Sequence, residues 1–132
     1  MSRFKEGEGL NGQTWRRRDL TFVDDTVAGF VAAAYTPAVA GRTIQLGTGH
    51  DVSVADLVEL VGELVGRDLE VETDPARVRS DGSEVLRLVS SPQLARELLD
   101  WEPVITLRDG LERTLRWMEE NRRRYRADHY AI

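Results

Sequence analysis

Arginine clusters give this sequence its best candidates for binding chemistry. Residues 16–18 are three consecutive arginines, and the tail at 122–126 (RRRYR) is also basic. A guanidinium group binds a phosphate through two parallel hydrogen bonds and stays charged in proteins. These basic clusters favour one phosphorylated small molecule as a ligand, and the alternative for the tail is a solvated helix end. The alternative for Arg18 is a surface ion pair with its neighbour Asp19.

The turn Gly47-Thr48-Gly49 is the second feature with a possible role in binding. A dinucleotide-binding fingerprint needs a third glycine three residues after the second, at the start of the following helix. Val52 stands at that position, so the fingerprint fails. Two interpretations stay open: the glycines only allow the turn, or they also let the backbone approach a ligand.

Composition excludes several function classes. The chain of 132 residues has no cysteine, and its histidines, His50 and His129, lack the spacing of a metal site. A net charge of −5 argues against nucleic-acid binding, which depends on neutralising phosphates. No apolar run has the length of a membrane span, and the N-terminus lacks the apolar core of a signal peptide. We therefore expect a cytoplasmic protein without a resident metal.

Residues 42–66 (RTIQLGTGHDVSVADLVELVGELVG) predict the unit that positions these groups. The apolar run at 43–46 predicts a buried strand, which ends at the glycine turn. Ser53 and Asp56 then mark the start of a helix whose apolar residues recur at three- and four-residue steps. Strand, turn and helix in this order indicate an α/β fold.

The rest of the chain predicts one domain over residues 16–132, after a flexible arm at 1–15. Its elements are strands at 20–23, 69–72 and 85–89, and helices from Asp24 or Asp25 to about Tyr35, from Ser91-Pro92 to about Asp100, and from Thr106 onward. We expect Trp101 and Trp117 to pack in the core.

Three segments resemble the extended short-chain dehydrogenases, the NAD-dependent epimerase/dehydratase family that acts on nucleotide sugars. RDLTFVDDTVAGF is similar to the Arg-Asp-aromatic-x-x-Val-Asp-Asp segment of this family, and TIQLGTGHDVSVADL is similar to its Asn-Ile-Gly-x-Gly segment. RVRSDGSEVLRLVSSPQLARELLDWEP resembles its closing stretch. The similarity covers residues 18–132 and is strongest to the 4,6-dehydratases of nucleoside-diphosphate sugars.

The resemblance implies the C-terminal, substrate-binding half of such an enzyme. In that half, short parallel strand pairs, 20–23 with 85–89 and 43–46 with 69–72, are covered by about four helices. The family places Arg18 and Arg79 against the pyrophosphate of the substrate. Phe22 matches an aromatic residue beside the sugar or base, and Gln45 replaces a substrate-binding asparagine. The alternative for Gln45 is that it binds backbone groups at a strand end.

The chemistry of the family depends on groups that this sequence lacks. The family oxidises the sugar with NAD and moves a proton with a Tyr-x-x-x-Lys pair. Lys5 is the only lysine and no tyrosine precedes it, so the pair is excluded by counting. Arginine stays charged and cannot replace it as a base. We therefore predict no catalytic residue and no NAD site in this chain alone.

Three functional hypotheses follow from the resemblance. The chain is the nucleotide-sugar-binding portion of a dehydratase whose cofactor domain is a separate partner, a non-catalytic module that binds a nucleotide sugar or a protein, or a remnant without ligand. The family packs the helix ending near Tyr35 and the strand at 43–46 against its cofactor domain. Without that domain an apolar face is open, which predicts self-association, another partner or local repacking.

Overall fold

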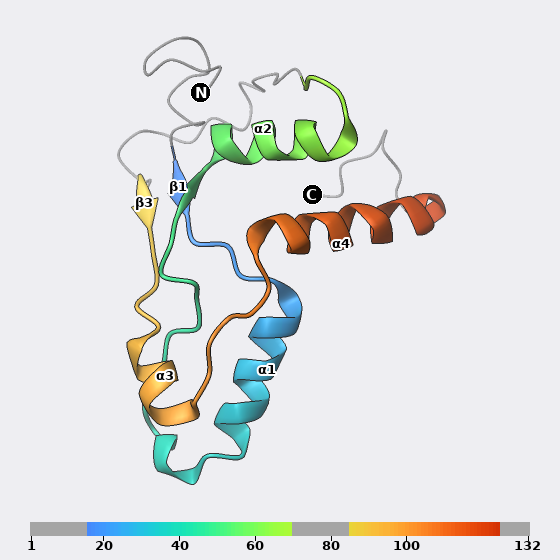
Figure 1. The fold of residues 1–132 in the computed structure, drawn as a ribbon. Coiled ribbons are helices and arrows are strands. Elements are labelled where there is room, and N and C mark those ends of the chain that lie inside the picture. The colour runs from blue at the N-terminus through green and yellow to red at the C-terminus, as the bar shows by residue number, and fades with distance from the viewer. Residues whose placement is uncertain (1–15, 70–84, 125–132) are drawn as a thin grey trace.

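The structure is a computed structural model, and it describes residues 16–69 and 85–124 (Figure 1). These residues form an α/β fold, as the sequence predicts. The described strands are β1 (Arg17–Arg18), β2 (Val52–Ser53) and β3 (Arg87–Leu88). The described helices are α1 (Val23–Ala34), α2 (Val54–Val65), α3 (Gln93–Leu99) and α4 (Leu107–Glu120), with short 3-10 turns η1 (Pro37–Val39) and η4 (Arg122–Arg124).

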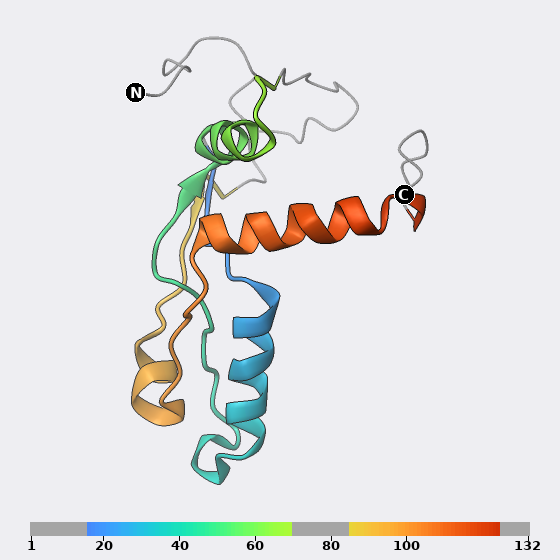
Figure 2. The same cartoon turned by 45° about the vertical axis from the view of Figure 1, so that its right-hand side comes forward.

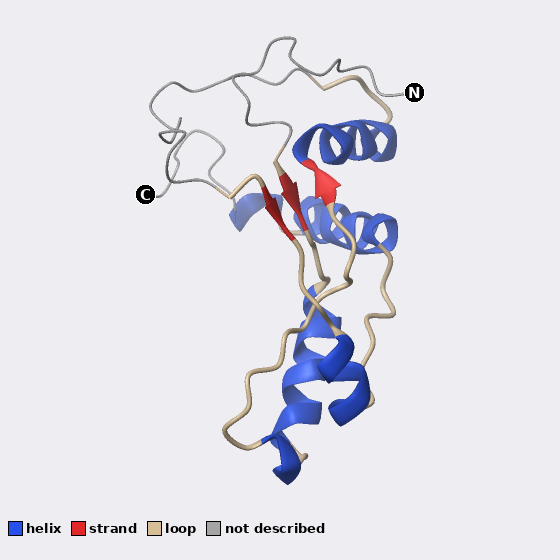
Figure 3. Cartoon of the chain, turned by 90° about the vertical axis from the view of Figure 1, so that its left-hand side faces the viewer, coloured by secondary structure: helices blue, strands red, loops and turns tan. Residues whose placement is uncertain are grey.

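The three strands form one small sheet in the order β2-β1-β3. β1 is antiparallel to β2, with Arg17 opposite Ser53, and parallel to β3, with Arg17 opposite Arg87. α2 and α4 lie near one end of this sheet, whereas α1 and α3 pack together beyond the other end (Figures 1 to 3). Every described strand is only two residues long, so the sheet has few hydrogen bonds of its own. It must be stabilised by packing against the helices and loops around it.

The predicted strand at 20–23 is wrong, because the sheet ladder lies earlier in the chain. The Arg17 amide donates to the Leu86 carbonyl at 2.9 Å, and the Asp19 amide donates to the Leu88 carbonyl at 3.0 Å. The pairing with 85–89 is therefore parallel, as expected, but it uses Arg17–Arg18. Helix α1 begins at Val23 and takes up the end of the predicted strand.

The predicted strand at 43–46 is also not part of a described sheet. Its expected partner, 69–72, lies outside the described residues except for Leu69. Among the described residues, the backbone amides of 43–46 donate no hydrogen bond, although Ile44 and Leu46 pack against the core. The apolar pattern correctly identifies an inward-facing extended segment, but it does not specify a partner strand.

Helix α2 starts as predicted, with a complete capping box. The Asp56 amide donates to Ser53 Oγ at 3.0 Å, and the Ser53 amide donates to Asp56 Oδ2 at 3.3 Å. The helix ends at Gly66, whose φ of 70° lies in the left-handed region. Thr106 likewise caps α4 by accepting the Asp109 amide at 3.1 Å.

The predicted caps of α1 and α3 are wrong. Asp24 and Asp25 lie in the first turn of α1, whose cap position is held by Phe22 without a side-chain bond. α3 begins at Gln93 with Pro92 at its cap position, again without a side-chain cap. Ser91 instead donates its backbone amide to Gln45 Oε1 at 2.7 Å. The residues predicted as caps therefore do not bond to the first amides of α1 and α3.

Replacing Ser53 with alanine tests the capping box. The buried Ser53 hydroxyl satisfies a helix amide, and loss of such a cap costs about 1 kcal/mol of the free energy of unfolding. Ser91→Ala is the matched control, because Ser91 is exposed and makes no cap. Urea unfolding followed by circular dichroism should separate the two variants; equal stability would contradict the assigned cap.

The core lies between α1, α3 and the loops that join them. Trp101, Leu99, Ala95 and Val39 are buried, and Leu46 is among the residues that pack against them. The Trp101 indole also donates to the Asp25 carbonyl at 2.9 Å. The prediction for Trp101 is confirmed. The prediction for Trp117 is wrong, because 47% of this residue is exposed on α4.

Candidate functional site

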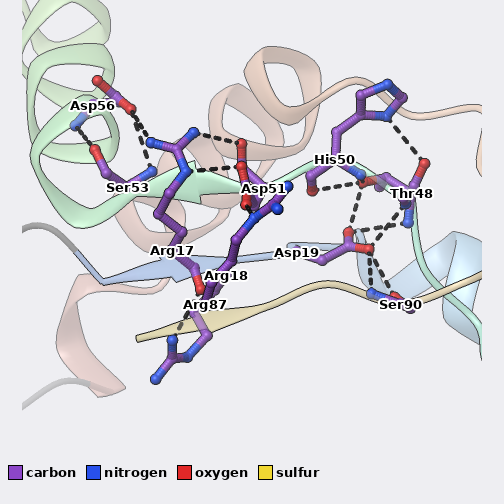
Figure 4. Close-up of polar contacts among 11 residues, drawn as sticks. Arg17, Arg18, Asp19, Thr48, His50, Asp51, Ser53, Asp56, Arg87 and Ser90 are labelled. Atoms are coloured by element: carbon purple, nitrogen blue, oxygen red, sulfur yellow. Dashed lines mark hydrogen bonds and ion pairs between the residues drawn. The ribbon is translucent and has the colours of Figure 1, made fainter. Parts of the chain in front are cut away.

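Asp19 joins three chain segments just beyond β1. Its Oδ1 accepts the Thr48 amide at 3.0 Å and the Thr48 hydroxyl at 2.6 Å. Its Oδ2 accepts the Gly49 amide at 2.9 Å, the Ser90 hydroxyl at 2.7 Å and the Ser90 amide at 3.3 Å (Figure 4). Burial raises the pKa of Asp19, but the hydrogen bonds from Thr48, Ser90 and Gly49 outweigh it and hold the pKa below its ordinary value.

The glycine turn fits around this carboxylate. A side chain at Gly47 would place its Cβ 1.7 Å from Ser90 Oγ and 2.8 Å from Asp19 Oδ2. Gly49 has a φ of 77°, which favours glycine. The first glycine therefore permits a close approach and the second permits the bend. The first interpretation, that the glycines allow the turn, is therefore observed, and the close approach is to Asp19 and Ser90 of the chain itself.

This turn does not fit a cofactor pyrophosphate. The amides of Thr48 and Gly49 already donate to a carboxylate, whose negative charge would repel a phosphate. The Asp56 amide in the first turn of α2 is likewise already bonded, because it donates to Ser53 Oγ. The residues of the glycine turn therefore have a structural role, since they bond to Asp19 of another segment. We assign them no contact with NAD.

An arginine pair bound to one carboxylate lies beside this junction. Arg17 Nε donates to Asp51 Oδ1 at 2.8 Å, and Arg87 Nε donates to Asp51 Oδ2. Arg17 also approaches Asp56 Oδ2 at 3.7 Å. The hydrogen bonds from Arg87 and Arg17 hold the pKa of Asp51 below its ordinary value. Two cations and two anions thus lie together, from β1, β3, the loop before β2 and the start of α2 (Figure 4).

Arg18 turns to the other side of the sheet from Arg17, as alternate residues of a strand do (Figure 4). Its Nη1 donates to the Arg17 carbonyl at 2.9 Å, and the residue is half-buried. The Asp19 carboxylate accepts its described hydrogen bonds from Thr48, Gly49 and Ser90. The other arginine predicted to contact phosphate, Arg79, lies outside the described residues.

Phe22 and Gln45 have structural partners of their own. Phe22 packs against Gly110 of α4, where a Cβ would lie 2.9 Å from its ring, and the Arg113 guanidinium carbon lies 5.6 Å from the ring centroid. Gln45 is exposed and accepts the Ser91 amide, and with Asp19 and Ser90 it lines a hollow of about 300 Å³. For Gln45 the backbone-binding alternative is therefore observed.

Asp51, Arg87 and Ser90 belong to the site, but no sequence pattern indicated them. Arg17 and Asp51 are 34 residues apart, and Asp19 and Ser90 are 71 apart, so no local spacing relates them. The β1–β2 pairing brings Asp51 to Arg17, and the β1–β3 pairing brings Arg87 and Ser90 to the same site. Within residues 16–69 and 85–124, no group of three or more potential ligands is arranged to hold a metal ion, and no helix is long and apolar enough to cross a membrane.

Comparison with known proteins gives consistent sequence and structural matches. A UDP-glucose 4-epimerase of Mycolicibacterium smegmatis is 35% identical over 98 residues, 74% of this chain and 30% of its own length. A dTDP-glucose 4,6-dehydratase of Streptomyces griseus is 35% identical over 117 residues, 88% of this chain and 33% of its own length. No family model matches.

A solved structure shares the fold. It is a UDP-glucuronic acid 4-epimerase from Bacillus cereus in complex with UDP-4-deoxy-4-fluoro-glucuronic acid and NAD, with a TM-score of 0.74 and 25% identity. The match covers 85% of this chain and 35% of that one. The chain thus spans about a third of the length of the curated relatives it matches.

Proposed function

Because this chain belongs to the NAD-dependent epimerase/dehydratase family, the extended short-chain dehydrogenases, we propose that it holds the diphosphate of a nucleoside-diphosphate sugar. The observation that carries the proposal is the gathering of Arg17, Arg18 and Arg87 on two adjacent strands. We propose residues 16–132 as one binding unit, in which Arg79 adds a further guanidinium.

The hydrogen-bond donors at this strand pair support the proposal of an anionic ligand. Asp51 binds both guanidinium groups and fixes their orientation, and Asp56, 3.7 Å from Arg17, is a second carboxylate beside them. The side chains of Arg17 and Arg87 remain 41% and 68% exposed. Arg17 Nη2 also donates to the Asp51 carbonyl at 3.2 Å, so Arg87 is the more accessible of the two. Arg18 adds a third cation on the other side of the sheet (Figure 4). A diphosphate supplies the acceptor oxygens that such an arrangement binds.

We propose that the ligand is the substrate of a 4,6-dehydratase, such as dTDP-glucose, on the similarity of residues 18–132 to those enzymes. An epimerase substrate such as UDP-glucose is the competing candidate, because an epimerase and a dehydratase match with the same 35% identity. Binding by the purified chain distinguishes them: the dehydratase proposal requires tighter binding of dTDP-glucose than of UDP-glucose.

In this proposal the chain binds and orients the sugar nucleotide but does not transform it. The sequence has no Tyr-x-x-x-Lys pair, and the amides of the glycine turn bind Asp19. Oxidation by NAD would then need a cofactor-binding domain or partner outside these 132 residues. The non-catalytic binding module remains the second candidate, and it predicts no activity when such a partner is added.

Titration of the ¹⁵N-labelled chain tests the proposal directly. We expect dTDP-glucose to shift amide signals near Arg18 and Arg79, and NAD to shift none. Arg18→Met should weaken the binding of the sugar nucleotide about tenfold, which is the effect expected from the loss of one charge-assisted hydrogen bond. Arg122→Met is the matched control, because Arg122 is 80% exposed on η4 and lies 4.0 Å from Glu119.

Two results would contradict the proposal. One is equal affinity of the Arg18 and Arg122 variants, which would remove Arg18 from the binding site. The other is dehydratase activity of the chain alone, which would overturn the conclusion drawn from the missing proton-transfer pair. Circular dichroism of both variants checks that any loss of binding does not come from unfolding.

A further inference from the structure

The arginine pair at the sheet is already occupied by acidic groups of the chain itself. Arg17 directs each of its nitrogens to an acceptor: Nε donates to Asp51 Oδ1 at 2.8 Å, Nη2 donates to the Asp51 carbonyl at 3.2 Å, and Nη1 lies 3.7 Å from Asp56 Oδ2. Arg87 Nε donates to the other carboxylate oxygen of Asp51 (Figure 4). Two guanidinium groups and two carboxylates carry no net charge together. An added anion therefore finds no net attraction here while both carboxylates keep their partners.

Asp51 binds the two arginines in the way that a phosphate would. A carboxylate and a phosphate both present several oxygens on one central atom, and guanidinium groups bind each of them through charge-assisted hydrogen bonds. In Asp51, each oxygen accepts from a different guanidinium group. The hydrogen bonds from Arg87 and Arg17 hold the pKa of Asp51 below its ordinary value, so the group is ionised at neutral pH. Asp51 thus occupies the place that an anionic ligand of both arginines would take.

The three groups differ in their freedom to move. The Asp51 side chain is only 9% exposed, and it is the fixed member. Arg17 lies in β1, the central strand of the described sheet, and makes two hydrogen bonds to Asp51. Arg87 lies in β3, which has a described neighbour on one side only, and among the described residues it donates through Nε alone. Arg87 is therefore the group that can leave Asp51 at the lowest cost.

We propose that Asp51 is an internal competitor for the anion-binding site: Arg87 rests on Asp51 in the free chain and exchanges this carboxylate for a phosphoryl group of the ligand. The inference rests on the proposed function, because it concerns the same arginines and a ligand that carries a diphosphate. It adds that the affinity of the site depends on this exchange as well as on the number of arginines. Arg18, on the other side of the sheet, takes no part in the exchange (Figure 4).

Asp51→Asn distinguishes a competitor from a residue that only orients the arginines. Asparagine keeps the size of aspartate and one acceptor oxygen, but it removes the negative charge. Loss of a residue that only orients the arginines would weaken the binding of an anion. Loss of a competitor should instead tighten the binding of inorganic pyrophosphate about fivefold, which is the effect of removing one exposed ion pair from the free state. The binding of dTDP-glucose should tighten by the same factor, because the exchange involves only the diphosphate.

Isothermal titration calorimetry of the full chain measures the affinity for both ligands. Asp24→Asn is the matched control, because it makes the same change in net charge at an exposed carboxylate, 3.6 Å from Arg113, and it should leave both affinities unchanged. Arg87→Met should weaken the binding of pyrophosphate. In the Arg87→Met background, Asp51→Asn should tighten binding by less than about twofold, because the group that makes the exchange is missing. Circular dichroism checks that each variant is folded.

Nitrogen-15 NMR of the arginine side chains provides an independent measurement. In the free chain the Arg87 Nε–H donates to Asp51, so saturation with pyrophosphate should shift its signal. The signal is assigned by its absence from Arg87→Met. A signal that stays unchanged at saturation would overturn the inference, because no exchange would have taken place.

The calorimetric outcomes separate the inference from the proposed function. Equal or weaker binding of pyrophosphate by Asp51→Asn, with dTDP-glucose still weakened by Arg18→Met, would overturn the inference alone. Tighter binding of pyrophosphate by Asp51→Asn, with no binding of dTDP-glucose by either protein, would support the exchange and overturn the proposed function. Binding of neither ligand by either protein would overturn both.

Discussion

Replacing Trp101 with alanine is expected to lower the free energy of unfolding by about 3–5 kcal/mol, the usual cost of removing a buried tryptophan. Trp101 is only 5% exposed and packs with Ala95, Leu99 and Val39. Few side chains of the described residues are buried, so the chain has little other core to compensate. Urea unfolding followed by far-ultraviolet circular dichroism measures the loss without relying on tryptophan fluorescence.

Trp117→Ala is the control for this experiment. The sequence analysis assigned both tryptophans to the core, whereas in the structure Trp117 is 47% exposed. Its replacement should cost at most about 2 kcal/mol, because much of the side chain already contacts water. An equal loss from both replacements would contradict the position of the core.

Trp101→Phe separates packing from hydrogen bonding. Phenylalanine keeps most of the apolar area but cannot replace the bond from the indole N–H to the Asp25 carbonyl. We expect this variant to lose about 1–3 kcal/mol, the cost of leaving a buried acceptor without its donor. A loss as large as that of Trp101→Ala would show that the hydrogen bond, and not the area, dominates.

The helices were the most predictable part of this fold. Their apolar spacing is local, and for α2 and α4 the capping residues Ser53 and Thr106 act on amides three residues away. Local sequence therefore contains the information. The caps predicted for α1 and α3 failed because Asp25 and Ser91 bond to Val104, Ile105 and Gln45, which lie 46 to 80 residues away.

The strands were harder to predict, because a two-residue strand has no measurable period. β1 consists of Arg17 and Arg18, whose composition suggests a solvated loop. It becomes a strand by pairing with β2 on one side and β3 on the other. At 20–23, Phe22 packs against α4, but Leu20 and Val23 are 40% and 61% exposed. At 43–46, Ile44 and Leu46 pack against the core, and the predicted partner strand at 69–72 lies outside the described residues except for Leu69.

The candidate site divides in the same way. The sequence identified Arg18 and the glycine turn from local patterns, but it gave no role to Asp51, Arg87 or Ser90, whose contacts cross from one segment to another. Asp19 was considered only as a neighbour of Arg18. In the structure it is the residue on which the geometry of the turn depends, since Thr48, Gly49 and Ser90 all donate to it.

Asp19→Asn should therefore destabilise the chain by about 2–4 kcal/mol at neutral pH, because hydrogen bonds to a charged acceptor are strong and an amide NH₂ cannot accept. Asp24→Asn is the control: Asp24 is exposed and only 3.6 Å from Arg113, a pair worth at most about 1 kcal/mol. Guanidinium or urea unfolding of the three proteins gives the comparison.

The pH dependence identifies the ionised carboxylate as the cause. The folded-state pKa of Asp19 is lowered, so its contribution to stability is fully present above the unfolded pKa of about 3.9 and is lost as the pH falls through the folded pKa. The stability difference between the original chain and Asp19→Asn should be constant from about pH 5 to 7 and shrink below about pH 4. A difference that persists unchanged into strong acid would mean that the amide disturbs packing and that the charge of Asp19 is not what joins the three segments.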